Sequence, residues 1–88
     1  MIKDEYELLY QMRTRKAFIL DIYDNRNSEH TTELEDYTRD NTYDTVSKKL
    51  IYRLLKNGVL KMRDASKCLE LDETTFYLPE QELELFNL

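Results

Sequence analysis

The sequence predicts a small α+β domain that is mainly helical, with three helices followed by a C-terminal β-hairpin. Over most of residues 4–57, apolar side chains recur at spacings of three and four, as on the buried face of a helix. After the single glycine, Gly58, apolar and basic residues alternate instead, which is typical of a strand. The chain has 88 residues, which is room for one domain with a modest core.

The first helix is predicted from residue 4 to about residue 26, because good helix formers dominate and the apolar side chains share a face. A polar interruption at residues 13–16 leaves open a division into two helices. Residues 25–28 indicate a stop, since Asn and Ser favour caps and turns. A second, short helix is predicted at residues 31–37, where threonines precede acids in the first turn.

The third helix, over residues 43–57, has the clearest pattern. Its apolar residues repeat at a period near 3.6 and are Tyr43, Val46, Leu50, Ile51 and Leu54. Lys56 stands in the last turn, where a cation complements the helix dipole. Gly58 follows and can adopt the left-handed conformation that ends many helices.

A hairpin is predicted after this glycine. Residues 59–63 alternate as a first strand, and residues 68–71 and 75–78 are the candidates for the return, with a turn at residues 72–74 between them. Pro79 ends the second candidate, because proline cannot donate to a ladder. Two further helices between Met62 and residue 78 remain an alternative.

Charge is segregated along the chain, although the net charge of −5 argues at first sight against a nucleic-acid partner. Residues 48–67 contain seven basic residues and a single acid, Asp64. Residues 17–47 carry eight acids against two bases, and residues 68–88 carry six acids and no base. This pattern predicts a folded surface with one basic region.

In this order, the elements resemble the winged helix-turn-helix DNA-binding domains of the multiple-antibiotic-resistance and arsenic-repressor type of transcriptional regulators. The stretches that carry the resemblance are residues 19–23, 32–34, 45–50, 54–60 and 76–80. The resemblance implies a single domain, with an N-terminal helical extension at 1–16, a winged core at 17–78 and a short tail or helix at 79–88. It also implies double-stranded DNA as the partner. The chain departs from the pattern of this family at residues 70–73, where the return strand of the expected wing is acidic.

The exposed face of the third helix is the predicted DNA-binding site, docked in the major groove. Lysine and arginine neutralise phosphates, while hydroxyl groups bond to phosphates or base edges. The residues expected to supply affinity are Lys48, Lys49, Arg53 and Lys56, with Tyr52 beside them, and those expected to discriminate between bases are Thr42, Tyr43, Thr45 and Ser47. Lys61, Arg63 and Lys67 are expected along the first arm of the hairpin, beside that helix. The alternative for the helix is an ordinary solvated face. The alternative for the three hairpin residues is protection of an edge strand.

Catalysis is not predicted, and neither is a metal or a cofactor. His30 is the only histidine and is expected to be solvated or capping, and Cys68 is expected to be a small buried hydrophobe. One glycine cannot build a glycine-rich phosphate loop. The acids lack the spacing of a calcium loop.

A cytoplasmic protein with no membrane association is predicted, since no apolar run could span a bilayer and no signal peptide is visible. Surplus apolar residues in the N-terminal helix predict a homodimer through that helix: Tyr6, Tyr10, Met12 and Phe18. The predicted function is therefore a sequence-specific transcriptional regulator without a catalytic site. The alternatives are a protein-interaction module that engages a partner through acidic surfaces, and an anionic inhibitor that mimics nucleic acid.

Overall fold

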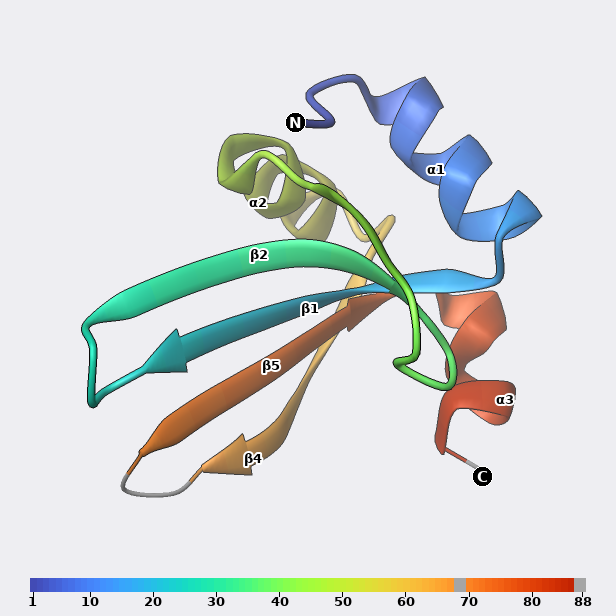
Figure 1. The fold of residues 1–88 in the computed structure, drawn as a ribbon. Coiled ribbons are helices and arrows are strands. Elements are labelled where there is room, and N and C mark those ends of the chain that lie inside the picture. Colours follow the sequence, from blue (N-terminus) through green and yellow to red (C-terminus); the bar gives the residue numbers. More distant parts are fainter. Residues whose placement is uncertain (68–69, 87–88) are drawn as a thin grey trace.

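The chain folds as an α+β domain around one antiparallel sheet (Figure 1). The computed structural model describes residues 1–67 and 70–86, apart from the side chains of residues 65–67. In chain order the elements are α1 (Glu5–Thr14), β1 (Ala17–Asp24), β2 (Glu29–Asp36), β3 (Thr42–Thr45), α2 (Lys48–Lys56), β4 (Lys61–Lys67), β5 (Leu71–Tyr77), the 3₁₀ helix η1 (Pro79–Gln81) and α3 (Glu82–Phe86).

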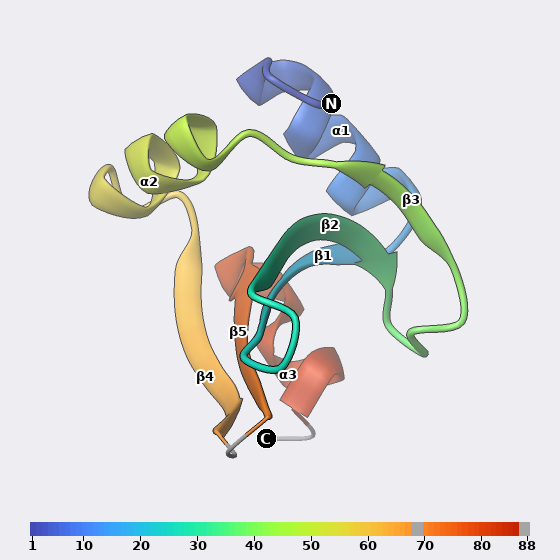
Figure 2. The same ribbon diagram turned by 60° about the vertical axis from the view of Figure 1, so that its left-hand side comes forward.

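The sheet has five strands in the order β3-β2-β1-β5-β4, and every neighbouring pair is antiparallel. Strands β1, β2 and β3 follow one another as a meander, and the β4–β5 hairpin pairs with the free side of β1. Helix α2 is the crossover that carries the chain from the β3 edge to the β4 edge, as Figure 2 shows. This connection places α2 over one face of the sheet.

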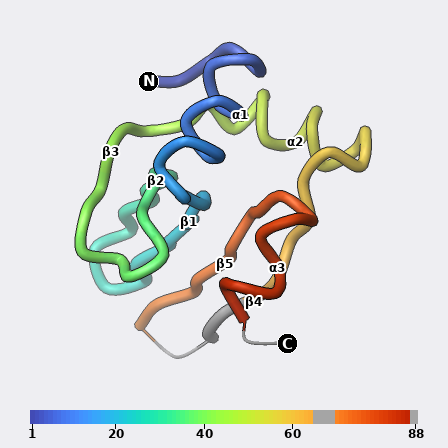
Figure 3. The backbone as a smooth tube through the Cα atoms, turned by 90° about the vertical axis from the view of Figure 1, so that its right-hand side faces the viewer, coloured from blue at the N-terminus to red at the C-terminus, as the bar shows by residue number. Residues whose placement is uncertain are grey.

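Helices lie on both faces of the sheet: α1 and α2 on one side, η1 and α3 on the other (Figures 1 and 3). The main core fills the space under α1 and α2, and its largest fully buried side chains include Leu8, Met12, Ile19, Leu34 and Leu54. A smaller core of Phe18, Leu20 and Tyr77 packs under α3. The N-terminal segment therefore contributes to the main core through Ile2, Leu8 and Met12.

The expectation of a mainly helical winged helix-turn-helix domain is wrong. Residues 17–24 and 31–36, expected to be helical, instead lie in the β1–β2 hairpin, which pairs in continuous register from Ala17 opposite Asp36 to Asp24 opposite Glu29. The first four residues of β1 are all buried, because both faces of this central strand are covered. A strand buried on both faces shows an unbroken apolar run, which periodicity alone does not distinguish from a buried helix.

Several local expectations do hold. Helix α1 ends at Thr14, at the polar interruption, although a strand and not a second helix follows. The end of α2 is confirmed: Gly58 has φ +77°, and the amides of Gly58 and Val59 donate to the carbonyls of Leu55 and Leu54. This pair of bonds is a Schellman motif.

The β4–β5 hairpin is also confirmed, and the alternative of two helices there is wrong. The turn expected at residues 72–74 lies instead inside β5, and part of the first candidate return strand, with Cys68, falls outside the described residues. The C-terminal segment forms η1 and α3 after Pro79. None of the helices in the described part of the chain is long and apolar enough to cross a membrane.

Gln81 joins three segments beneath the sheet. Its side-chain oxygen accepts from the amide of Leu78 at 2.9 Å. Its Nε2 donates to the carbonyl of Ala17 at 2.7 Å and lies 3.4 Å from that of Met12. The side chain thus ties η1 to the end of α1 and the start of β1.

Glu35 is a half-buried carboxylate on the α3 side of the sheet, opposite Phe18 in the β1–β2 register. Burial raises its pKa above the ordinary value of 4.5, Arg39 opposes the shift, and Glu33 adds to it. The associated stability is present below about pH 4.5 and is lost as the pH rises through the folded-state pKa. At neutral pH, the ionised side chain therefore costs stability.

Glu35→Gln is accordingly expected to raise the melting temperature at pH 7 by about 1–3 °C, and to have no such effect near pH 4. Thermal unfolding followed by circular dichroism at both pH values measures this. Glu29→Gln, at the exposed start of β2, is the control and should leave the melting temperature unchanged. A lower melting temperature for Glu35→Gln at pH 7 would contradict the assignment.

Candidate nucleic-acid interface

Helix α2 presents a basic face to solvent. Three of its apolar side chains, Leu50, Ile51 and Leu54, are buried in the main core and fix its orientation. The opposite face is exposed and carries Lys48, Lys49, Tyr52, Arg53 and Lys56. The amphipathic pattern read from the sequence therefore does describe this helix, over nine residues from Lys48 to Lys56.

Most cations elsewhere on the described surface are matched by a carboxylate. Examples are Arg13 with Glu80 at 2.9 Å and Lys61 with Glu82 at 3.7 Å. The cations with described side chains that form no ion pair are Lys3, Arg15, Lys48, Lys49, Lys56 and Arg63.

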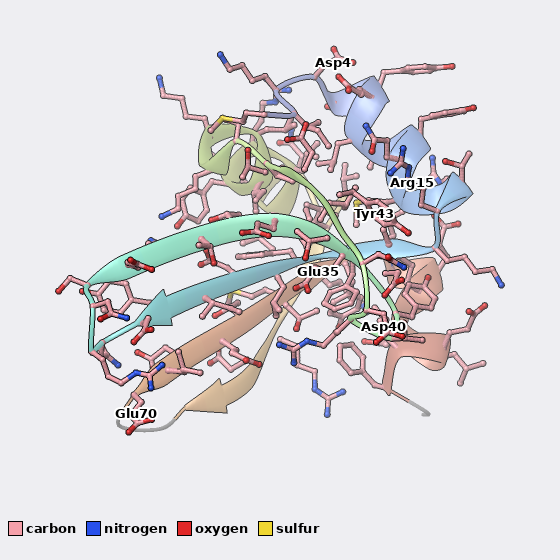
Figure 4. All side chains as sticks on the ribbon, viewed as in Figure 1. Asp4, Arg15, Glu35, Asp40, Tyr43 and Glu70 are labelled. Atoms are coloured by element: carbon pink, nitrogen blue, oxygen red, sulfur yellow. The ribbon has the colours of Figure 1, made fainter. Side chains whose placement is uncertain are left out.

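Two of these six are held by aromatic rings instead. The guanidinium of Arg15 lies 4.4 Å from the centre of the Tyr43 ring, and Figure 4 shows the two side chains together beside α1. That of Arg63 lies 4.1 Å from the centre of the Phe86 ring. The four that remain are all lysines, three of them on α2.

The fourth, Lys3, is brought beside α2 by the N-terminal strand. Ile2 forms a parallel bridge with Val46, and its carbonyl accepts from the Ser47 amide at 2.9 Å. Lys3 is therefore next to the start of α2. Arg53 completes the basic face, since its contact with Glu5 at 3.9 Å is between exposed groups and contributes little.

The start of α2 carries an electrostatic cost. Ser47 is the N-cap but makes no side-chain capping bond, and the first turn contains no acid. Lys48 and Lys49 occupy that turn instead, where the helix dipole disfavours cations. An anionic partner on this face would offset the cost.

The residues expected to discriminate between bases lie away from this face. Thr42, Tyr43 and Thr45 belong to β3, not to the helix. The Thr42 hydroxyl donates to Glu35 at 3.5 Å, and Tyr43 is half-buried against the main core. Only Ser47 remains at the start of α2.

The basic residues of the hairpin also point elsewhere. Lys61 pairs with Glu82 and Arg63 stacks on Phe86, so both face α3, on the side of the sheet opposite α2. Lys67 ends β4 opposite Asp72, and its side chain lies outside the described residues. The structure therefore brings together Lys48, Lys49, Tyr52, Arg53 and Lys56 but not the hairpin residues.

Sequence reasoning missed Lys3 and the partners of Lys48. Lys48 contacts His30, which in turn bonds to Asp21, and Asp21 is opposite Thr32 in the β1–β2 register. Reading residues 17–36 as a hairpin would have found this cluster. The pairing that places Lys3 has no local signal, because it joins residues far apart in the sequence.

Within residues 1–67 and 70–86, no group of three or more His, Cys, Asp or Glu side chains could hold a metal ion. Comparison with known protein families, curated proteins and solved structures finds no match to this chain.

Proposed function

We propose that the protein binds double-stranded DNA through the α2 basic face, which consists of Lys3, Lys48, Lys49, Tyr52, Arg53 and Lys56. One observation carries the proposal: the lysines of the described surface that form no ion pair all lie on α2 or next to its start. Lysine and arginine contacts to phosphates dominate DNA affinity. The acidic remainder of the molecule would turn this face toward the duplex.

The dimensions of α2 suit a duplex. A helix with its side chains is about 10–12 Å across, which fits the width of the major groove, about 12 Å. Phosphate contacts fix position but do not read sequence. Since the expected base-reading residues of β3 lie elsewhere, the proposal covers backbone binding, and sequence-specific regulation of transcription remains a prediction from the sequence alone.

Salt dependence tests the proposal. Fluorescence anisotropy with a random-sequence duplex between 50 and 200 mM salt should give a slope of log K against log salt of about −4, for four to five phosphate contacts. Lys49→Gln/Lys56→Gln is expected to make this slope about two units shallower and to weaken binding roughly tenfold at 50 mM.

The matched control is Lys16→Gln/Lys61→Gln. It changes the net charge equally but removes lysines that pair with Glu84 and Glu82 on the α3 side. Its slope should equal that of the wild type. Equal slopes for the two double variants would overturn the proposal, and no binding by the wild type at 50 mM salt would favour a protein partner instead.

We also infer that α1 mediates a homodimer. Tyr6 and Tyr10 are 80% and 60% exposed on its outer face, beside half-buried Leu9. The first turn is acidic and the last turn contains Arg13. Two α1 helices packed antiparallel would bury the tyrosines and bring opposite charges together.

Sedimentation velocity at high micromolar concentration should therefore show a dimer. Tyr6→Ser/Tyr10→Ser is expected to sediment as a monomer because it removes the apolar contact. Tyr52→Ser, which removes an exposed tyrosine from α2, should leave the dimer intact. A monomeric wild-type protein would refute the inference.

A further inference from the structure

His30 lies in a side-chain cluster between the β1–β2 hairpin and the start of α2. Its Nε2 is 2.7 Å from a carboxylate oxygen of Asp21, and the hydroxyl of buried Thr32 donates to the same oxygen at 2.7 Å. The ring meets that of Tyr23 edge to face, with centroids 5.8 Å apart. On the other side of the imidazole, Lys48 Nζ contacts Nδ1. The side chains facing His30 thus come from β1, from β2 and from α2.

These contacts decide which ring nitrogen carries the hydrogen when the imidazole is neutral. An ionised carboxylate only accepts hydrogen bonds, so Nε2 carries the hydrogen that points to Asp21. Nδ1 is then left with a lone pair, which accepts from the Lys48 ammonium. The carboxylate lies on the Nε2 side of the ring, away from the Lys48 side.

A second proton changes this arrangement. An imidazolium donates from both nitrogens, so Nδ1 can no longer accept from Lys48. Asp21 stabilises the charged ring from the Nε2 side, while Nδ1–H and the ammonium are two cationic donors side by side. An anion placed between them would accept from both.

We propose that His30 and Lys48 together bind a phosphate group, and that binding takes up a proton onto His30 Nδ1. One phosphate oxygen accepts from Nδ1–H and from the Lys48 ammonium, and the proton comes from solvent. The phosphate belongs either to the DNA backbone, in which case this inference rests on the proposed function, or to a free phosphate. Both sources present the same oxygens.

NMR can follow this site directly, because His30 is the only histidine and its ring protons give the only imidazole signals. At pH 7 and constant ionic strength, inorganic phosphate and, separately, a short duplex are titrated into the full-length protein. The ring signals are expected to move toward their positions at low pH. For the duplex, whose phosphodiesters do not titrate in this range, calorimetry in buffers of different ionisation enthalpy should show proton uptake, and affinity should rise as the pH falls from about 8 to about 6.

Lys48→Gln is expected to abolish the movement of the ring signals and the proton uptake. Lys61→Gln, an equal charge change on the opposite side of the sheet, should retain both. His30→Gln should bind the duplex with no pH dependence over this range, which separates proton uptake from loss of the fold.

The outcomes also separate the two proposals. A response to inorganic phosphate without duplex binding would support the site while refuting DNA binding, and would identify a free phosphate as its ligand. Duplex binding with unmoved ring signals and no proton uptake, together with no response to phosphate, would overturn the site and leave DNA binding standing. A response to the duplex that Lys48→Gln removes would support both.

Discussion

Replacing Leu54 with alanine is expected to lower the free energy of unfolding by about 2–5 kcal/mol. Leu54 is 0% exposed in the main core. The truncated side chain would leave a cavity beneath α2, in addition to the lost burial of apolar surface. A domain of 88 residues has a total stability of about 4–13 kcal/mol, so this single change removes a large share of it.

Urea unfolding followed by circular dichroism gives the measurement, and the midpoint should fall while the slope stays near its wild-type value. Leu55→Ala is the matched control, because Leu55 is the next residue along α2 but only half-buried. Leu55→Ala should lower the free energy of unfolding clearly less than Leu54→Ala does. A loss below about 1 kcal/mol for Leu54→Ala would mean that α2 is not held as described, and the orientation of its basic face would have to be revised.

The features of α2 that matter for both the core and the proposed interface could be predicted from sequence. A helix on one face of a sheet buries one stripe only, so its apolar spacing is unambiguous. Its end could also be read, because Gly58 is the one residue in the region that adopts a positive φ at no steric cost. The predicted start of α2 is five residues too early. Tyr43 in β3 and Val46 directly after β3 are apolar because they pack on the main core, and they continue the helical spacing by coincidence.

The β1–β2 hairpin shows where such reading fails. Ile19 faces the main core and Leu20 the smaller one, so adjacent residues are both buried and no alternation is visible. Thr32 of β2 is buried as well, where its hydroxyl is satisfied by Asp21. The β-branched and aromatic residues of this hairpin do favour strands. The prediction of helices rested instead on the spacing of three and four between apolar residues.

The candidate site depends on pairings that no local pattern encodes. Lys3 reaches α2 through the bridge between Ile2 and Val46, and His30 reaches Lys48 because the crossover lays α2 against the hairpin. Conversely, Lys61 and Arg63 fall on the far side because alternate residues of β4 face α3. Charge along the chain therefore indicated a basic region correctly, but only the topology decides which of its residues share a face.

Gln81→Glu is expected to destabilise the fold at neutral pH by about 3 kcal/mol or more, although the side chain keeps its shape. Gln81 is 4% exposed, and its Nε2 faces the carbonyl oxygens of Ala17 and Met12. The substitution places a carboxylate oxygen there, so two acceptors lose their donor and meet a negative charge. The bond that holds η1 to the end of α1 and the start of β1 becomes a repulsion.

The sign of the pH dependence distinguishes this mechanism from a general packing defect. Burial raises the pKa of the introduced carboxyl in the folded state above its unfolded value. The lost stability should therefore return as the pH falls below the unfolded value, about 4.3, because the protonated carboxyl can again donate to a carbonyl. Gln11→Glu, the same chemical change on the outer part of α1 beside Glu7, should cost only a few tenths of a kcal/mol. Urea unfolding of both variants at pH 7 and pH 4 measures this, and an equal loss for Gln81→Glu at the two pH values would contradict the proposed repulsion.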